Sequence, residues 1–135
     1  MEVESLTDAA LKKLQDHGFD TLGDCDRLLV TIWGLEADVN NGDFDQYYFN
    51  SYGDQAKMAP SALRAIGANR MAEIVELANT EFGQEGPPGD SSARRSRLEE
   101  ISEDAAPAWD ALEEEFWSYP DDIAALLTAH LATSG

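Results

Sequence analysis

The sequence predicts an all-α fold, with residues 1–135 forming a single domain built as an irregular bundle of about six to eight helices. Apolar residues recur at spacings of three and four along the chain, and no stretch shows the strict alternation that is typical of a half-buried strand. Glycine and proline interrupt this pattern at intervals. A chain of 135 residues with 43% hydrophobic content suffices for one buried core but not for two.

Two helices are predicted at the start of the chain. Residues 6–17 form the first, with Ser5 or Thr7 as its N-cap and Gly18 at its end. Residues 22–40 form the second, which is the expected spine of the core because its apolar residues make one wide stripe. That stripe consists of Cys25, Leu28, Leu29, Ile32, Trp33, Leu35 and Val39.

Shorter helices are predicted in the middle of the chain. Residues 44–51 form one of them, and a turn follows at residues 52–54. A further helical region begins near Pro60 and is interrupted by Gly67. The apolar stripe then continues to Gly83 through Met71, Ile74, Val75, Ala78 and Phe82.

Residues 83–92 are predicted to form a mobile loop, because their three glycines and two prolines break regular structure. The glycines are spaced GxxGxxG. However, no strand precedes them and the prolines lie among them, so we do not expect a phosphate-binding loop.

Three helices are predicted in the last third of the chain. Residues 92–104 and 107–118 form two of them, separated at Pro107, and Pro120 with Asp121 and Asp122 begins the last. The inward stripes are Trp109, Leu112 and Phe116 in one helix, and Ile123, Leu126, Leu127 and Leu131 in the next.

The chain is strongly acidic, with 27 acidic residues, 9 basic residues, a formal charge of -18 and a pI of about 4.1. Such a field repels polyanions, so it disfavours direct binding to nucleic acid or to an anionic membrane and favours a basic protein partner. The first residues include neither a basic start nor an apolar run. We therefore expect no signal peptide, no membrane span and a cytoplasmic location.

The acidic residues concentrate toward the C-terminus. Residues 99–135 hold ten acids and no lysine or arginine, and all ten acids fall within residues 99–122. That segment would span about 36 Å as a continuous helix, or about one charge per 3.6 Å, against about 3.4 Å per phosphate in one DNA strand. The predicted partner-binding residues are Glu99, Glu100, Glu103, Asp104, Asp110, Glu113, Glu114, Glu115, Asp121 and Asp122.

General surface acidification is an alternative explanation of these acids. It predicts acids on every exposed face and few lysines, and the chain has only Lys12, Lys13 and Lys57. Against this explanation, like charges recur four residues apart, as in Asp110 and Glu114, at a cost of a few tenths of a kcal/mol per pair. Local helix stability does not favour such pairs, so both explanations stay open.

Few side chains offer other chemistry. His17 lies at a predicted helix end and His130 in an apolar stripe, and neither has a nucleophile at a motif spacing. Cys25 is expected to be a core thiol, and a single cysteine forms no internal disulfide. The chain has neither a calcium loop nor a zinc pattern, so we expect no metal, no cofactor and no catalytic residue.

The only basic cluster is Arg94, Arg95 and Arg97, which leads directly into Glu99 and Glu100. We interpret it as a set of intrahelical ion pairs, such as Arg95 with Glu99, each contributing a few tenths of a kcal/mol at most.

Residues 38–51 read Asp-Val-Asn-Asn-Gly-Asp-Phe-Asp-Gln-Tyr-Tyr-Phe-Asn-Ser. This segment resembles the signature of the bacterial DNA-mimic protein family, written E-V-N-N-G-G-F-x-Q-Y-F-x-N-S. Residues 62–63, 66–68 and 71–82 are also similar, so the resemblance covers about residues 28–82. It implies an all-α fold and, by likeness to the characterised member, a dimer that presents carboxylates in place of DNA phosphates to a helix-turn-helix transcription factor.

Two positions depart from that signature: Asp38 replaces a glutamate and Asp43 replaces the second glycine. Asn41 and Gly42 are expected to end the long helix in a left-handed conformation. Asp43 and Gln46 have the spacing of a capping box for the next helix.

The remaining motif residues are expected to pack and to reverse the chain. Phe44, Tyr47 and Tyr48 should face the core at positions i, i+3 and i+4. The amides of Gln46 and Asn50 should satisfy backbone groups where the chain reverses. We therefore interpret as structural the family motif Asp38, Asn41, Gly42, Phe44, Gln46, Tyr47 and Asn50.

The leading hypothesis is a DNA-mimic protein that binds a basic DNA-binding protein, such as a transcription regulator, and blocks its DNA site with carboxylates. A dimer would help, because one chain is marginal as a duplex mimic. The alternative is an inhibitor or immunity protein against a basic toxin or enzyme, centred on an aromatic anchor such as Trp109, Trp117 or Tyr119. An enzyme using residues 46–50 with nearby acids is the remote third possibility.

Overall fold

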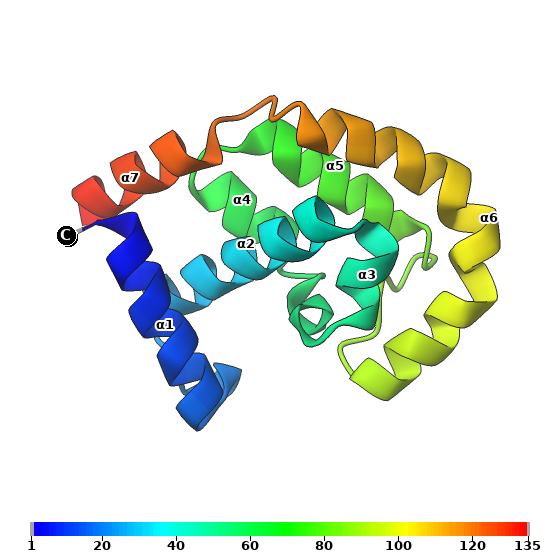
Figure 1. The fold of residues 1–135 in the computed structure, drawn as a ribbon, viewed down its shortest axis with the longest axis horizontal. Helices are drawn as coiled ribbons and strands as arrows, with labels where there is room; N and C mark the ends of the chain where they lie inside the picture. Colours follow the sequence, from blue (N-terminus) through cyan, green and yellow to red (C-terminus); the bar gives the residue numbers. More distant parts are fainter. Residues whose placement is uncertain (1, 135) are drawn as a thin grey trace.

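The computed structural model describes residues 2–134, which form seven α-helices and two short 3-10 helices without any strand (Figure 1). The all-α prediction is therefore confirmed. The elements in order are α1 (Val3–His17), η1 (Phe19–Thr21), α2 (Asp24–Asn41), α3 (Phe44–Phe49), η2 (Ser51–Gln55), α4 (Ala59–Ala65), α5 (Asn69–Thr80), α6 (Ser91–Trp117) and α7 (Ile123–Ser134).

Helix α2 is the spine of the core, as its apolar stripe predicted. Ile32, Leu35 and Val39 are fully buried, and α1, α3 and α4 all pack against this helix. Figure 1 shows α2 crossing the middle of the molecule, while α6 arches around one end and α7 extends back to meet α1. None of the helices in residues 2–134 is both long and apolar enough to cross a membrane.

Helix α1 begins earlier than predicted, and its expected cap is wrong. The N-cap position is Glu2, without a capping side chain, while the hydroxyl of Thr7 donates to the carbonyl of Val3 inside the helix. The predicted end is confirmed, because Gly18 follows the helix with a φ of 86°. A positive φ of this kind favours glycine.

Cys25 and Trp33 lie at the edge of α2 and not in its core. The side chain of Cys25 is exposed in the first turn of the helix, so the prediction of a core thiol is wrong. Trp33 is 41% exposed. Cys25 lies seven residues before Ile32, on nearly the same side of the helix, but the buried residues of α2 begin only at Leu29, one turn further along.

The predicted turn at residues 52–54 is a short 3-10 helix, η2, which packs against both α2 and α3. Two glycines allow that close approach. A Cβ atom at Gly34 would collide with the ring of Tyr52, and one at Gly53 would lie 2.6 Å from the carbonyl oxygen of Tyr47. The following helix α4 has Pro60 in its first turn, and Gly67 follows its end with a φ of 88°, as expected.

The largest departure from prediction is α6, one helix of 27 residues that runs through Pro107. Proline costs about 3 kcal/mol inside a helix, because it removes one hydrogen bond and clashes with the preceding turn. Buried residues on both sides of it, Ala105 and Trp109, pack against the body of the protein and hold the helix together. Pro107 itself is exposed, and Figure 1 shows α6 curving around α3 and α5.

The segment predicted as a mobile loop connects α5 to α6, and its later residues contact the protein. Pro87 is buried, and the carbonyls of Pro88 and Gly89 each accept a hydrogen bond from Arg94 at 3.2 Å. Asp90 caps α6 by accepting from the backbone N–H of Ala93. The mobility of this segment stays a prediction.

Candidate acidic interface on helix α6

Helix α6 has one buried face and one acidic face. Leu98, Ala105, Trp109 and Phe116 are buried against the rest of the protein. At 100° per residue, four exposed acids lie within an arc of about 60° on an outward side of the helix, about 100–160° round the axis from the buried residues. These acids are Glu99, Glu103, Asp110 and Glu114.

Two more exposed acids, Glu100 and Asp104, flank this row, and we call the six residues together the acidic ridge. Its ends, Glu99 and Glu114, are fifteen residues apart, or about 22 Å along a straight helix axis. Of the six carboxylates, only that of Glu100 has an ion-pair partner among the described residues, Arg97 at 3.1 Å. The ridge is therefore a nearly uncompensated row of negative charge.

The remaining four predicted binding residues are held in contacts within the protein. Glu113 is the most buried of them. Its carboxylate accepts a 2.9 Å hydrogen bond from the backbone N–H of Phe44, the first residue of α3. Burial raises the pKa of Glu113, the Phe44 bond lowers it in part, and nearby Asp43 and Asp110 raise it further.

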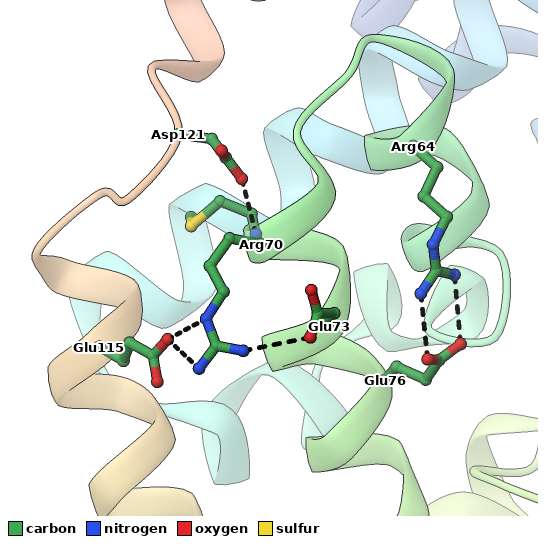
Figure 2. Close-up of polar contacts among 7 residues, drawn as sticks. Arg64, Arg70, Glu73, Glu76, Glu115 and Asp121 are labelled. Carbon is green, nitrogen blue, oxygen red and sulfur yellow. Dashed lines mark hydrogen bonds and ion pairs between the residues drawn. The ribbon is translucent and has the colours of Figure 1, made fainter.

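Glu115 joins α6 to α5. Figure 2 shows the guanidinium of Arg70 between two carboxylates, that of Glu115 on α6 and that of Glu73 on its own helix. The Arg70 to Glu73 distance is 3.2 Å. The Glu115 carboxylate is half-buried and paired, so it is less available to a partner than the ridge carboxylates.

Asp121 and Asp122 act as helix caps. The side chain of Asp121 accepts from the backbone N–H of Met71 at 2.8 Å, which satisfies an N–H in the first turn of α5 (Figure 2). Asp122 accepts from the N–H of Ala125 at 3.1 Å and caps α7. The predicted binding residues therefore divide into six on the ridge and four in structural contacts.

Exposed acids also occur on other faces of the molecule, for example Glu4, Asp8 and Asp16 on α1. Several of those elsewhere have a cation beside them, such as Asp16 with Lys12 at 4.0 Å and Glu76 with Arg64 at 3.0 Å. The ridge differs in its arrangement along one helix, where only Glu100 has an ion-pair partner among the described residues.

The interpretation of the arginine cluster as intrahelical ion pairs holds only for Arg97 with Glu100. Arg94 is fully buried and reaches residues far away in the chain. Arg95 donates to the carbonyl of Phe49 at 2.8 Å, and its guanidinium lies 4.6 Å from the centre of the Phe49 ring. The acceptors of Arg94 are the carbonyls of Tyr48, Asn50, Pro88 and Gly89, at 2.6–3.2 Å, and the carboxylate of Asp54, at 2.9 Å.

Arg94 was not predicted because its partners are mostly backbone carbonyls, which no residue pattern marks. The one available signal was an arginine placed at i-4 from Leu98, on the inward stripe of the helix. Its position shows that α6 and the loop before it close over η2 and the end of α3.

The family motif is organised around Asp38, which is buried in α2. Its Oδ1 atom accepts from the amide of Asn50 at 3.1 Å and from that of Gln46 at 3.5 Å. These amides were expected to bond backbone groups, and that prediction is wrong because α3 packs against α2 at the carboxylate. Burial raises the pKa of Asp38, and the two amides lower it in part.

The structure also tests the predicted end of α2 and the predicted cap of α3. Asp43 caps α3 by accepting from the N–H of Gln46 at 2.7 Å, as predicted, but the Gln46 side chain turns to Asp38 and does not complete the capping box. Gly42 has a φ of -159°, so the expected left-handed end of the long helix is wrong. Its Cβ would meet the Gln46 side chain. Asn41 is exposed.

The aromatic residues of the motif face the core as predicted, with Phe44, Tyr47 and Tyr48 fully buried. The hydroxyl of Tyr48 donates to the side chain of Asn79 at 2.6 Å. Burial raises the pKa of Tyr47 well above its usual value. The Tyr48 to Asn79 hydrogen bond joins α3 to α5.

The three candidate aromatic anchors differ in exposure. Trp109 is buried, with its indole N–H donating to the carbonyl of Ala78. Tyr119 is half-buried and donates to Glu36 at 2.6 Å, and burial raises its pKa to about 12. Trp117, in the last turn of α6, is 46% exposed. Only Trp117 presents enough surface to anchor a partner.

The histidines lie where the apolar pattern placed them. His17 is exposed in the last turn of α1, and His130 is half-buried in α7. Within residues 2–134, His, Cys, Asp and Glu side chains nowhere gather in a group of three that could hold a metal ion.

The fold and the ridge together define a class of protein: a small, acidic, all-α domain with a row of carboxylates along a solvent-facing helix. The chain belongs to the DMP19-like protein family, whose model matches residues 20–134 and which is a family of DNA-mimic proteins. The resemblance inferred from the sequence is thus confirmed at the level of the family, and the match extends over α6. Neither the curated proteins nor the solved structures contain a match.

Proposed function

We propose that this chain is a DNA mimic that binds a basic DNA-binding protein, such as a transcription regulator, in the cytoplasm and blocks its DNA site. It acts by binding, without a catalytic step or a cofactor. The observation that carries this proposal is the acidic ridge, because its carboxylates are exposed, follow a single helix and, except for that of Glu100, have no ion-pair partner among the described residues. Membership of the DMP19-like family supports it independently.

The charge density of the ridge suits this role. Six carboxylates over about 22 Å have a mean axial spacing of about 4.5 Å, compared with about 3.4 Å per phosphate along one DNA strand. The row has one gap, between Asp104 and Asp110, where Pro107 lies. A partner that contacts phosphates through separated lysine or arginine side chains tolerates such a gap.

A duplex presents two strands of phosphates, whereas one chain presents one row. We therefore propose that two copies act together, each supplying a ridge. Light scattering after gel filtration is expected to give the mass of a dimer at working concentrations. A monomer that still binds the partner and displaces its DNA would contradict this part of the proposal.

The test of the ridge is a pull-down from the source cells at low salt, followed by competition with DNA for the captured protein. The ridge variant changes Glu103→Gln, Asp110→Asn and Glu114→Gln. Its control removes the same charge elsewhere through Glu2→Gln, Asp20→Asn and Glu85→Gln, all at exposed positions off the ridge. We expect the ridge variant to bind roughly tenfold more weakly, with the control unchanged.

Salt should weaken the interaction steeply, because each ridge carboxylate contributes a little through screened charge. Capture of no basic DNA-binding protein, or equal loss of binding in the ridge variant and its control, would count against the proposal. The second result would favour general acidification of the surface.

The exposure of Trp117 favours one alternative, an inhibitor or immunity protein that anchors a basic toxin or enzyme on this indole. A single change, Trp117→Ala, separates the two functions. Mimicry predicts an affinity within a few-fold of wild type with the salt dependence retained. Anchoring predicts loss of binding at every salt concentration.

A further inference from the structure

A second candidate site lies between α1, α2 and α7, where α6 contributes no residue. It is a cavity of about 310 Å³. Its apolar wall includes Leu29, Trp33 and Leu127. A volume of this size suits one side chain or one small ligand and is too small for an entering helix.

The polar part of the cavity lining is acidic. Three carboxylates, those of Glu4, Asp8 and Glu36, line it together with the apolar wall, and no lysine, arginine or histidine is among the described residues that line it. Glu36 is held in place by the hydroxyl of Tyr119 at 2.6 Å. Burial raises the pKa of Glu36, and the hydrogen bond from Tyr119 lowers it in part.

Trp33 gives the cavity an aromatic surface, which contacts a second ring. The indole is 41% exposed and meets the ring of Tyr52 edge-on, with the ring centres 5.6 Å apart and an interplanar angle of 67°. Tyr52 in turn packs directly on Gly34, where a Cβ atom would collide with its ring. The indole is thus supported on one side while part of it stays accessible.

We propose that this cavity binds an arginine side chain presented by an exposed segment of a protein partner. An indole ring beside carboxylates attracts a cation through both the ring quadrupole and direct charge. A guanidinium suits the site better than an ammonium, because it is planar, less strongly hydrated and able to stack on the ring while donating to carboxylates. The apolar wall accommodates its methylene chain.

This site does not depend on the ridge, so the two can be tested separately. The probe is a blocked Gly-Arg-Gly peptide titrated into the full chain, and the readout is the indole N–H signals of the three tryptophans in a ¹H–¹⁵N spectrum. Trp33→Phe assigns the relevant signal. The indole of Trp109 donates to Ala78 inside the core and serves as an internal reference.

We expect the Trp33 signal to shift and saturate, with a dissociation constant on the order of millimolar, while the Trp109 signal stays in place. Peptides with lysine or citrulline replacing arginine should bind more weakly, and the neutral citrulline weakest of all. Equal affinity for the citrulline peptide would overturn the proposal, because the cavity would then be only an apolar groove. Equal affinity for lysine would overturn the choice of arginine.

Two double variants test whether the carboxylates that line the cavity attract the arginine side chain. Glu4→Gln with Asp8→Asn should weaken binding roughly three- to tenfold. The control, Asp20→Asn with Glu85→Gln, removes the same charge from residues that do not line the cavity, and should leave the affinity within about twofold. Circular dichroism checks that each variant is folded. Equal weakening in both would refute a localised site, and the ridge variant should titrate like wild type whether or not the ridge binds DNA-binding proteins.

Discussion

At the scale of single residues, Arg94 is the only lysine or arginine among residues 2–134 whose side chain is buried. It is fully buried, and its guanidinium joins the end of α3 to the loop before α6 through backbone carbonyls. A buried charge is costly unless each of its donors is satisfied, and here five acceptors surround it. The acidic ridge depends on this contact, because Arg94 sits in the first turn of the ridge helix.

Arg94→Met is therefore expected to lower the free energy of unfolding by about 3–5 kcal/mol, since the buried carbonyl of Tyr48 and the partly buried carbonyls of Pro88 and Gly89 lose their donor. Urea denaturation followed by circular dichroism measures the change. The matched control is Arg95→Met, whose side chain is exposed and stacks on Phe49, and whose loss should cost about 1 kcal/mol or less. Similar losses for both variants would contradict the special role of Arg94.

At the scale of secondary structure, acids in and after α6 have two different tasks. Those on its outer face stay exposed, while Glu113, Glu115 and Asp121 tie the helix and its C-terminal continuation to α3 and α5. Helix α5 has no capping side chain of its own at Ala68, so its first turn relies on Asp121, fifty residues further along. Substitution of an acid that ties α6 to other helices is therefore expected to lower the stability, whereas substitution of an exposed ridge acid is not.

Asp121→Ala is expected to destabilise the protein by about 1–2 kcal/mol, because the N–H of Met71 loses its acceptor. Asp104→Ala serves as the control, since that side chain is exposed on the ridge, and it should change the stability by less than about 0.5 kcal/mol. Thermal unfolding of the two variants separates them. A stability loss at Asp104 comparable to that at Asp121 would show that the ridge is structural.

At the scale of the whole molecule, the net charge of -18 and the buried carboxylates both make the folded protein less stable as the pH rises. The pKa values of Asp38 and Glu113 are raised in the folded state, mainly by burial. The folded protein therefore binds protons more tightly than the unfolded chain above pH 4.5, and stability falls as pH rises through the folded pKa values. Repulsion between the surface carboxylates adds to this fall.

The free energy of unfolding should accordingly increase as the pH is lowered from about 7 toward the ordinary carboxyl pKa values of about 4. Glu113→Gln tests one source of this effect, because the amide oxygen can still accept from Phe44 but carries no charge. This variant should be at least as stable as wild type at pH 7 and should show a weaker pH dependence. Glu76, whose pKa Arg64 lowers, opposes the trend only at lower pH, so a loss of stability between pH 7 and 5.5 would contradict the prediction.

Much of the fold could be predicted because helical periodicity is a local property. The stripe of α2, the buried aromatic residues of the motif and the stops at Gly18 and Gly67 all follow from residues within a few positions of one another. Local patterns gave the wrong result at Pro107, where two helices were predicted and one is present. The local cost of this proline is real, but packing of Ala105 and Trp109 on other helices outweighs it.

The sequence by itself determined that this protein is all-α, strongly acidic and similar to DNA-mimic proteins, since composition and short patterns carry that information. Only the tertiary structure decided which carboxylates form the ridge and which are used inside the fold. The reason is that the hydrogen-bond partner of a side chain depends on packing between segments far apart in the chain. The Glu113 carboxylate, for example, accepts from the N–H of Phe44, 69 residues away. A row of acids along the chain becomes a surface only where the other helices leave one face of α6 uncovered.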